Sequence, residues 1–201
     1  MHMEVEFEAK FYPVNKVETR NKLSEIGATC THPERLMRRT MATKDKYPQL
    51  PCDYIRVRDE GDVIRMSAKV HASSNGDLSD QKELDFLVSD FEKAVEMITI
   101  MGYKPEMYQE TFRETWQIDD AEIVIDTWPG LKPYIEIEST SEARVRSVAE
   151  SLGLSWNARR ITSVIEIYAE IYHLTNKTVK ELISHLTFDK NPFEENMQNS
   201  L

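Results

Sequence analysis

The start of the chain carries a strictly alternating pattern. From Glu4 to Phe11, every even position is charged and every odd position is apolar. A period of two predicts a β-strand with one apolar face and one charged face. Its charged face holds Glu4, Glu6, Glu8 and Lys10 in one row. A solvated strand tolerates such a row, whereas an enclosed strand requires cations opposite the carboxylates. The rest of the chain decides between these two situations.

Composition narrows the class of protein. The chain has 201 residues, enough for one substantial core, and a formal net charge of -10, which argues against a general nucleic-acid binder. No apolar run approaches the roughly 20 residues of a membrane span, so we expect no membrane partner. Cys30 and Cys52 lack metal-ligand spacing and are interpreted as reduced thiols of a cytoplasmic protein. The sequence does not decide whether the protein is a monomer or a homodimer.

Seven further segments are predicted as strands, mostly in hairpins: 34–44, 53–59, 63–70, 82–88, 107–118, 122–128 and 134–138. Helices are expected at about 15–26, 90–101, 141–152, 157–173 and from 175 or 176 to about 186, from their apolar stripes and terminal residues. The pattern predicts an α+β protein of eight strands that ends in helices.

The charged strand faces have two interpretations. On periodicity alone, the solvated face of an antiparallel sheet is favoured. The helices, however, have apolar stripes that the apolar strand faces would cover. A strongly curved sheet would then turn its charged faces inward together, as a closed barrel with a polar lumen. In such a lumen, arginines and lysines suit an oxyanion chain such as a polyphosphate, and carboxylates suit Mg²⁺ or Mn²⁺.

Several short motifs of charged residues follow one another along the chain. The first is the E-x-E-x-K motif Glu6-Phe-Glu-Ala-Lys10. The others are the R-x-R strand Tyr54–Arg58, the lysine strand Met66–Lys69, the acidic strand Glu83–Asp85, Arg113, and Asp126–Leu131 followed by Tyr134–Glu138. In this order they resemble the motifs of the CYTH family, the triphosphate tunnel metalloenzymes. Each motif alone is weak, but the ordered set is specific and covers roughly the first 140 residues.

The resemblance implies a closed eight-stranded antiparallel barrel, the triphosphate tunnel, with helices packed outside. Residues 1–140 would form the tunnel, and residues 141–201 a helical extension packed on it within the same domain. Catalytic roles are implied for Glu6, Glu8, Lys10 and Asp126. Triphosphate binding is implied for Lys10, Arg56, Arg58, Arg65, Lys69 and Arg113. Metal binding is implied for Glu6, Glu8, Asp126, Glu136 and Glu138, and a supporting role that holds the arginines for Glu83 and Asp85.

The resemblance also sets the expected reaction. The implied enzyme is a phosphohydrolase that uses Mg²⁺ or Mn²⁺ and acts on inorganic tripolyphosphate, a nucleoside triphosphate or thiamine triphosphate. The alternatives are a class IV adenylyl cyclase, which forms cyclic AMP and pyrophosphate from ATP, and a non-catalytic polyphosphate-binding module. Two positions depart from the family pattern, since Thr111 stands in place of a lysine and Lys132 in place of a glycine. Arg38 or Arg39 would supply the missing charge, but alternation does not decide which one faces the lumen.

Overall fold

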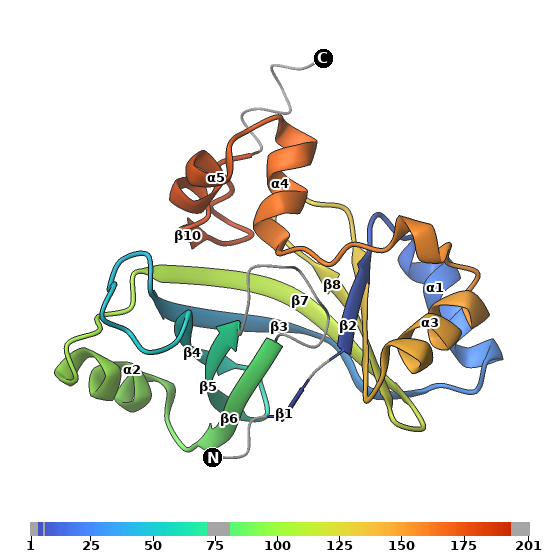
Figure 1. Ribbon diagram of the computed structural model, residues 1–201, viewed down its shortest axis with the longest axis horizontal. Helices are drawn as coiled ribbons and strands as arrows, with labels where there is room; N and C mark the ends of the chain where they lie inside the picture. Colours follow the sequence, from blue (N-terminus) through green and yellow to red (C-terminus); the bar gives the residue numbers. More distant parts are fainter. Residues whose placement is uncertain (1–3, 6, 72–80, 194–201) are drawn as a thin grey trace.

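A computed structural model describes residues 4–5, 7–71 and 81–193 (Figure 1). The strands are β1 (Glu4–Val5), β2 (Phe7–Phe11), β3 (Thr29–Thr43), β4 (Tyr54–Asp59), β5 (Ile64–His71), β6 (Gln81–Val88), β7 (Met107–Ile118), β8 (Ala121–Thr127), β9 (Tyr134–Ser139) and β10 (His185–Leu186). The helices are α1 (Lys16–Glu25), α2 (Phe91–Ile100), α3 (Glu142–Ser151), the 3-10 turn η2 (Trp156–Ala158), α4 (Val164–Tyr172) and α5 (Asn176–Leu182). The protein is therefore of the α+β class.

The described strands form one curled sheet (Figure 1). Its order is β1-β6-β5-β4-β3-β7-β8-β9-β2, every neighbouring pair is antiparallel, and β10 adds to β7 in parallel. β1 and β2, at the two ends of this order, follow one another in the chain. They are separated only by residue 6, which lies outside the described residues. β1 pairs with β6 and β2 pairs with β9, so the N-terminal segment reaches both edges of the curled sheet.

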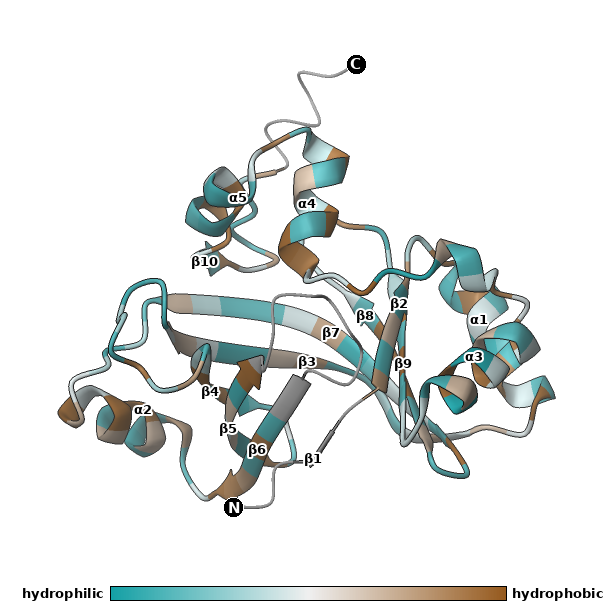
Figure 2. Ribbon diagram, viewed as in Figure 1, coloured by the Kyte–Doolittle hydropathy of each residue, from teal (hydrophilic) through white to brown (hydrophobic). Residues whose placement is uncertain are grey.

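Helices α1, α2 and α3 cover the apolar face of the sheet. Hydrophilic and hydrophobic residues alternate along the strands (Figure 2). Helices α1 and α3 share a core with β2, β7, β8 and β9, in which Leu23 and Val145 are fully buried. Helix α2 packs on β3 and β4 through Phe91 and Ile98. Because the helices take the apolar face, the charged face is left to line the inside of the curl.

The C-terminal elements form a third core at one end of the sheet. Tyr168 of α4 and Val179 of α5 pack with Trp128, which follows β8. Tyr168 donates a hydrogen bond of 2.6 Å to the carbonyl of Pro129. The domain division at residue 140 stays a prediction.

The predicted strands all occur, but three boundaries differ by more than two residues. The last helix ends at Leu182 rather than at about 186, and His185–Leu186 instead form β10, which pairs with β7. β3 begins at Thr29 rather than at 34. The helix expected over about 157–173 begins only at Val164. Arg160 and Lys10 instead exchange two backbone hydrogen bonds, of 2.8 and 3.0 Å, which keep this segment extended. The Glu166 carboxylate accepts from the Ser163 backbone N–H and marks the true start of α4.

Candidate active site

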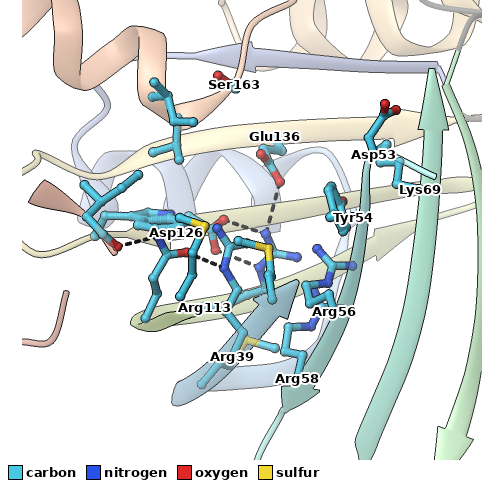
Figure 3. A pocket seen from close by; sticks show the side chains of 18 of the residues that line it. Arg39, Asp53, Tyr54, Arg56, Arg58, Lys69, Arg113, Asp126, Glu136 and Ser163 are labelled. Carbon is cyan, nitrogen blue, oxygen red and sulfur yellow. Dashed lines mark hydrogen bonds and ion pairs between the residues drawn. The ribbon is translucent and has the colours of Figure 1, made fainter. Parts of the chain in front are cut away.

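A cavity of about 1400 Å³ lies inside the curl, between the sheet and the segments that begin α4 and end α5. The described residues that were predicted for the site all line it: Glu8, Lys10, Arg56, Arg58, Arg65, Lys69, Glu83, Asp85, Arg113, Asp126, Glu136 and Glu138. Glu6 lies outside the described residues. The alternation explains the arrangement, since intervening residues such as Ala9, Val57 and Ile135 are fully buried in the cores. Figure 3 shows part of this charged lining.

Arg113 of β7 is paired with two carboxylates. Its Nε and Nη2 reach the two carboxylate oxygens of Asp126 at 2.7 and 2.5 Å, and Nη2 also lies 3.1 Å from Glu136 Oε2 (Figure 3). Burial lowers the pKa of Arg113, but Asp126 and Glu136 outweigh burial and hold this pKa well above its ordinary value. Both oxygens of Asp126 are thus engaged by the guanidinium, and its role as a metal ligand stays a prediction.

Glu136 of β9 is a carboxylate of the site with a strongly lowered pKa. Lys10 of β2 is its direct cross-strand partner, and the Lys10 ammonium lies 3.1 Å from Glu136 Oε1 while also contacting Glu8. Burial alone would raise the pKa of Glu136. The Lys10 and Arg113 charges reverse this effect and bring the pKa down to about 2. The carboxylate is therefore strongly held in its ionised form.

The remaining predicted cations also face carboxylates. Arg56 donates to Glu83 at 2.7 Å, and Lys69 lies 3.8 Å from Glu83 and 3.9 Å from Glu8. Arg65, nearer the rim, pairs with Asp85. Burial and the Coulombic effect of Arg56 and Arg113 lower the pKa of Arg58 to about 10. The cavity thus concentrates positive charge and balances most of it with acids.

Sequence reasoning missed two residues of the site and left a third undecided. Glu60 lies between the strands predicted at 53–59 and 63–70, but it is 7% exposed and accepts from Arg58 Nε at 2.8 Å. Arg35 lines the cavity and donates to the Glu60 carbonyl at 2.7 Å. Arg39, rather than Arg38, faces the cavity. The alternation of 35, 37 and 39 along β3 was the available signal, and the adjacent Arg38 obscured it.

The acids at the β2–β9 edge fit a hard divalent cation. Glu8 and Glu138 are direct cross-strand partners, and Glu122 of β8 faces Glu138 from the other side. Like charges in such positions repel one another unless a cation lies between them, and carboxylate oxygens suit Mg²⁺ or Mn²⁺. Within residues 4–5, 7–71 and 81–193, no group of three or more His, Cys, Asp or Glu side chains is already close enough to hold a metal.

These features define a class of protein in which a curled antiparallel sheet surrounds a cavity lined by paired acidic and basic residues. The model of the CYTH domain family matches residues 4–162. The chain therefore belongs to the CYTH family. No curated protein matches the sequence. None of the helices in the described part of the chain is long and apolar enough to cross a membrane.

Solved structures share this fold. PH1012 from Pyrococcus horikoshii OT3 is 21% identical with a TM-score of 0.65, over 80% of this chain and 98% of that one. A candidate adenylate cyclase from Vibrio parahaemolyticus is 16% identical with a TM-score of 0.68, over 84% and 99%. A candidate adenylyl cyclase from Hippeastrum, described as having a dominant triphosphatase activity, is 13% identical with a TM-score of 0.51, over 86% and 97%.

Proposed function

We propose that the protein is a divalent-metal-dependent phosphohydrolase for a triphosphate-containing substrate: inorganic tripolyphosphate, a nucleoside triphosphate or thiamine triphosphate. The observation that carries the proposal is the set of guanidinium and ammonium groups from β2, β4, β5 and β7 that line one cavity opposite carboxylates of β2, β6, β8 and β9. A polyanion would pair with the basic residues of this lining, and the cations that accompany the polyanion would pair with the acidic residues. In this proposal the curled sheet, whose two end strands are β1 and β2, closes into a tunnel.

The roles are those that the resemblance to the CYTH family implies, and the charges of the cavity-lining side chains support them. Lys10, Arg56, Arg58, Arg65, Lys69 and Arg113 bind the phosphate oxygens, and Glu83 and Asp85 orient the arginines. Glu6, Glu8, Asp126, Glu136 and Glu138 would hold Mg²⁺ or Mn²⁺, and catalytic roles are proposed for Glu6, Glu8, Lys10 and Asp126. The cation would neutralise negative charge on the phosphate oxygens. The arginines stabilise the charge on the transferred phosphoryl group and align it for attack.

Hydrolysis requires only water as the nucleophile. The water oxygen bonds to the terminal phosphorus, the bridging P–O bond breaks, and orthophosphate leaves along with the shortened chain. The second candidate is an adenylyl cyclase, in which the ribose 3′-hydroxyl attacks the α-phosphorus and pyrophosphate leaves. The likeness to the Vibrio parahaemolyticus candidate cyclase favours testing this reaction as well. With Cys30 and Cys52 as free thiols, we expect a cytoplasmic enzyme, a monomer or homodimer, with a small-molecule substrate and no nucleic-acid or membrane partner.

The test is a product assay. The purified protein is incubated with tripolyphosphate, ATP or thiamine triphosphate in the presence of Mg²⁺ or Mn²⁺. Release of orthophosphate supports the hydrolase, and cyclic AMP with pyrophosphate supports the cyclase. Tight binding of triphosphate without any product would overturn both and support a binding module.

A further inference from the structure

Arg39 of β3 differs from three other arginines that line the cavity. It lines the same space as Arg56, Arg58 and Arg113 and lies among them in Figure 3. Each of those three guanidinium groups has a carboxylate partner, namely Glu83, Glu60 or Asp126. Among the residues that the structure describes, no carboxylate pairs with Arg39. Its positive charge is therefore not balanced by a neighbouring acid.

Two neutral side chains hold Arg39 in place. The guanidinium carbon lies 4.5 Å from the ring centroid of Trp128, and Nε donates to Gln109 Oε1 at 2.9 Å. Gln109 is fully buried, and its Nε2 donates to the Ile183 carbonyl at 2.8 Å, just after α5. Stacking and one hydrogen bond orient the group but leave the donors on Nη1 and Nη2 for another acceptor.

The electrostatic surroundings of Arg39 favour an anion. Burial and the neighbouring charges of Arg56 and Arg113 lower the pKa of Arg39 to about 10. An anion placed among these three guanidinium groups would relieve the repulsion and meet a planar fork of donors, the geometry that suits phosphate oxygens. A side chain kept only for stability would not be expected to carry an unbalanced charge beside two others.

We propose that Arg39 is a substrate-binding residue that engages a phosphate group of the substrate directly, and that it does so before a divalent cation is bound. This inference rests on the proposed function, because it takes the substrate to be a polyphosphate. To bind phosphate, the paired cations must give up their carboxylate partners; these cations are Lys10, Arg56, Arg58 and Arg113. Arg39 has no carboxylate partner among the described residues, so it can bind phosphate without breaking an ion pair. Gln109 acts as a positioning residue that fixes the Arg39 fork and ties it to the C-terminal segment.

The test measures binding of inorganic tripolyphosphate by calorimetry in the presence of a chelator. Arg39→Met should weaken binding by about tenfold or more, the effect of losing a charge-assisted contact. Arg38→Met is the matched control, because Arg38 precedes Arg39 on the same strand but pairs with Asp59 at 3.0 Å and covers the Phe91 ring. We expect its affinity to stay within about twofold of the wild-type value, since it makes no contact with the bound anion.

A second measurement separates binding from folding. Thermal unfolding of unliganded Arg39→Met should occur close to the wild-type temperature, since removal of the unbalanced charge offsets the loss of the hydrogen bond to Gln109. A purely structural Arg39 would instead lower it. Arg39→Lys keeps the charge but loses the fork and Nε, and it should bind with intermediate affinity.

Three results would overturn the inference: no wild-type binding in chelator, unchanged affinity of Arg39→Met, or equal losses in the Arg38 and Arg39 variants. Failure of the proposed function is distinguishable, because this assay requires no turnover. A wild-type protein that binds tripolyphosphate through Arg39 but forms no product would refute the hydrolase and leave the inference standing.

Discussion

Replacing Glu136 with glutamine tests whether the site is held together by charge. Glutamine has nearly the shape of a protonated glutamate, so the change removes the ionised form alone. A pKa lowered from 4.5 to about 2 corresponds to ~3 kcal/mol of stabilisation when the carboxylate is ionised. We therefore expect Glu136→Gln to reduce the free energy of unfolding at pH 7 by ~3 kcal/mol, measured in urea by circular dichroism. This value is an upper bound, because in the variant Lys10 still pairs with Glu8 and Arg113 still pairs with Asp126.

The pH dependence gives a sharper check of the same change. Because the folded-state pKa is depressed, the contribution is complete above pH 4.5 and disappears as the pH falls toward 2. The stability difference between wild type and variant should thus fall to about half by pH 3. Glu150→Gln, which breaks an exposed i,i+4 pair with Arg146, is the control and should change stability by less than ~1 kcal/mol. A Glu136 variant as stable as the wild type at pH 7, or a difference that does not vary with pH, would refute the reasoning.

Arg113→Met should destabilise the protein by ~3–5 kcal/mol in urea, because it leaves the Asp126 carboxylate, 2% exposed, without its partner. Adding Asp126→Asn should recover part of that loss, and no recovery would contradict the pairing. Tyr168→Phe removes the donor to the Pro129 carbonyl and should cost ~1–2 kcal/mol, whereas an unchanged melting temperature would show that this contact is not needed. Chelation should abolish product release, and Mg²⁺ or Mn²⁺ should restore it; activity that survives in chelator would exclude the proposed cation.

Strand alternation predicted which side chains share one face of the sheet, but not that this face lines a cavity. A period of two assigns every second residue to one face whatever the partner strand is, so Arg56, Arg58 and Glu136 could be placed on a common charged face. The helix stripes supplied the reason for that face to point inward. The buried positions of Val57 and Ile135, on the opposite face of their strands, follow from the same rule.

Long-range contacts explain what the sequence did not predict. The stripe of Ile161, Val164 and Tyr168 fits a helix locally, but backbone pairing of Arg160 with Lys10, 150 positions earlier, keeps the first part extended. Glu60 follows a strand and therefore has no alternation to place it.

Arg38 and Arg39 are a further case, since two successive arginines give no register of their own. The contacts of Arg38 with Asp59 and Phe91 on the outside decide that Arg39 is the one that faces the cavity. Those partners lie on β4 and α2, and alternation within β3 alone contains no information about them.

The balance of charges in the cavity bears on the order of binding. Lys10, Arg56 and Arg113 are neutralised by acids of the same cavity, so a polyphosphate that binds them displaces carboxylates such as Glu83 and Glu136. Those acids are then left without partners in a buried site, at a large free-energy cost unless another cation meets them. Substrate and divalent cation should therefore bind with positive coupling, each raising the affinity of the other by the same factor. Arg39 is outside this exchange, which is why metal-free binding isolates its contribution.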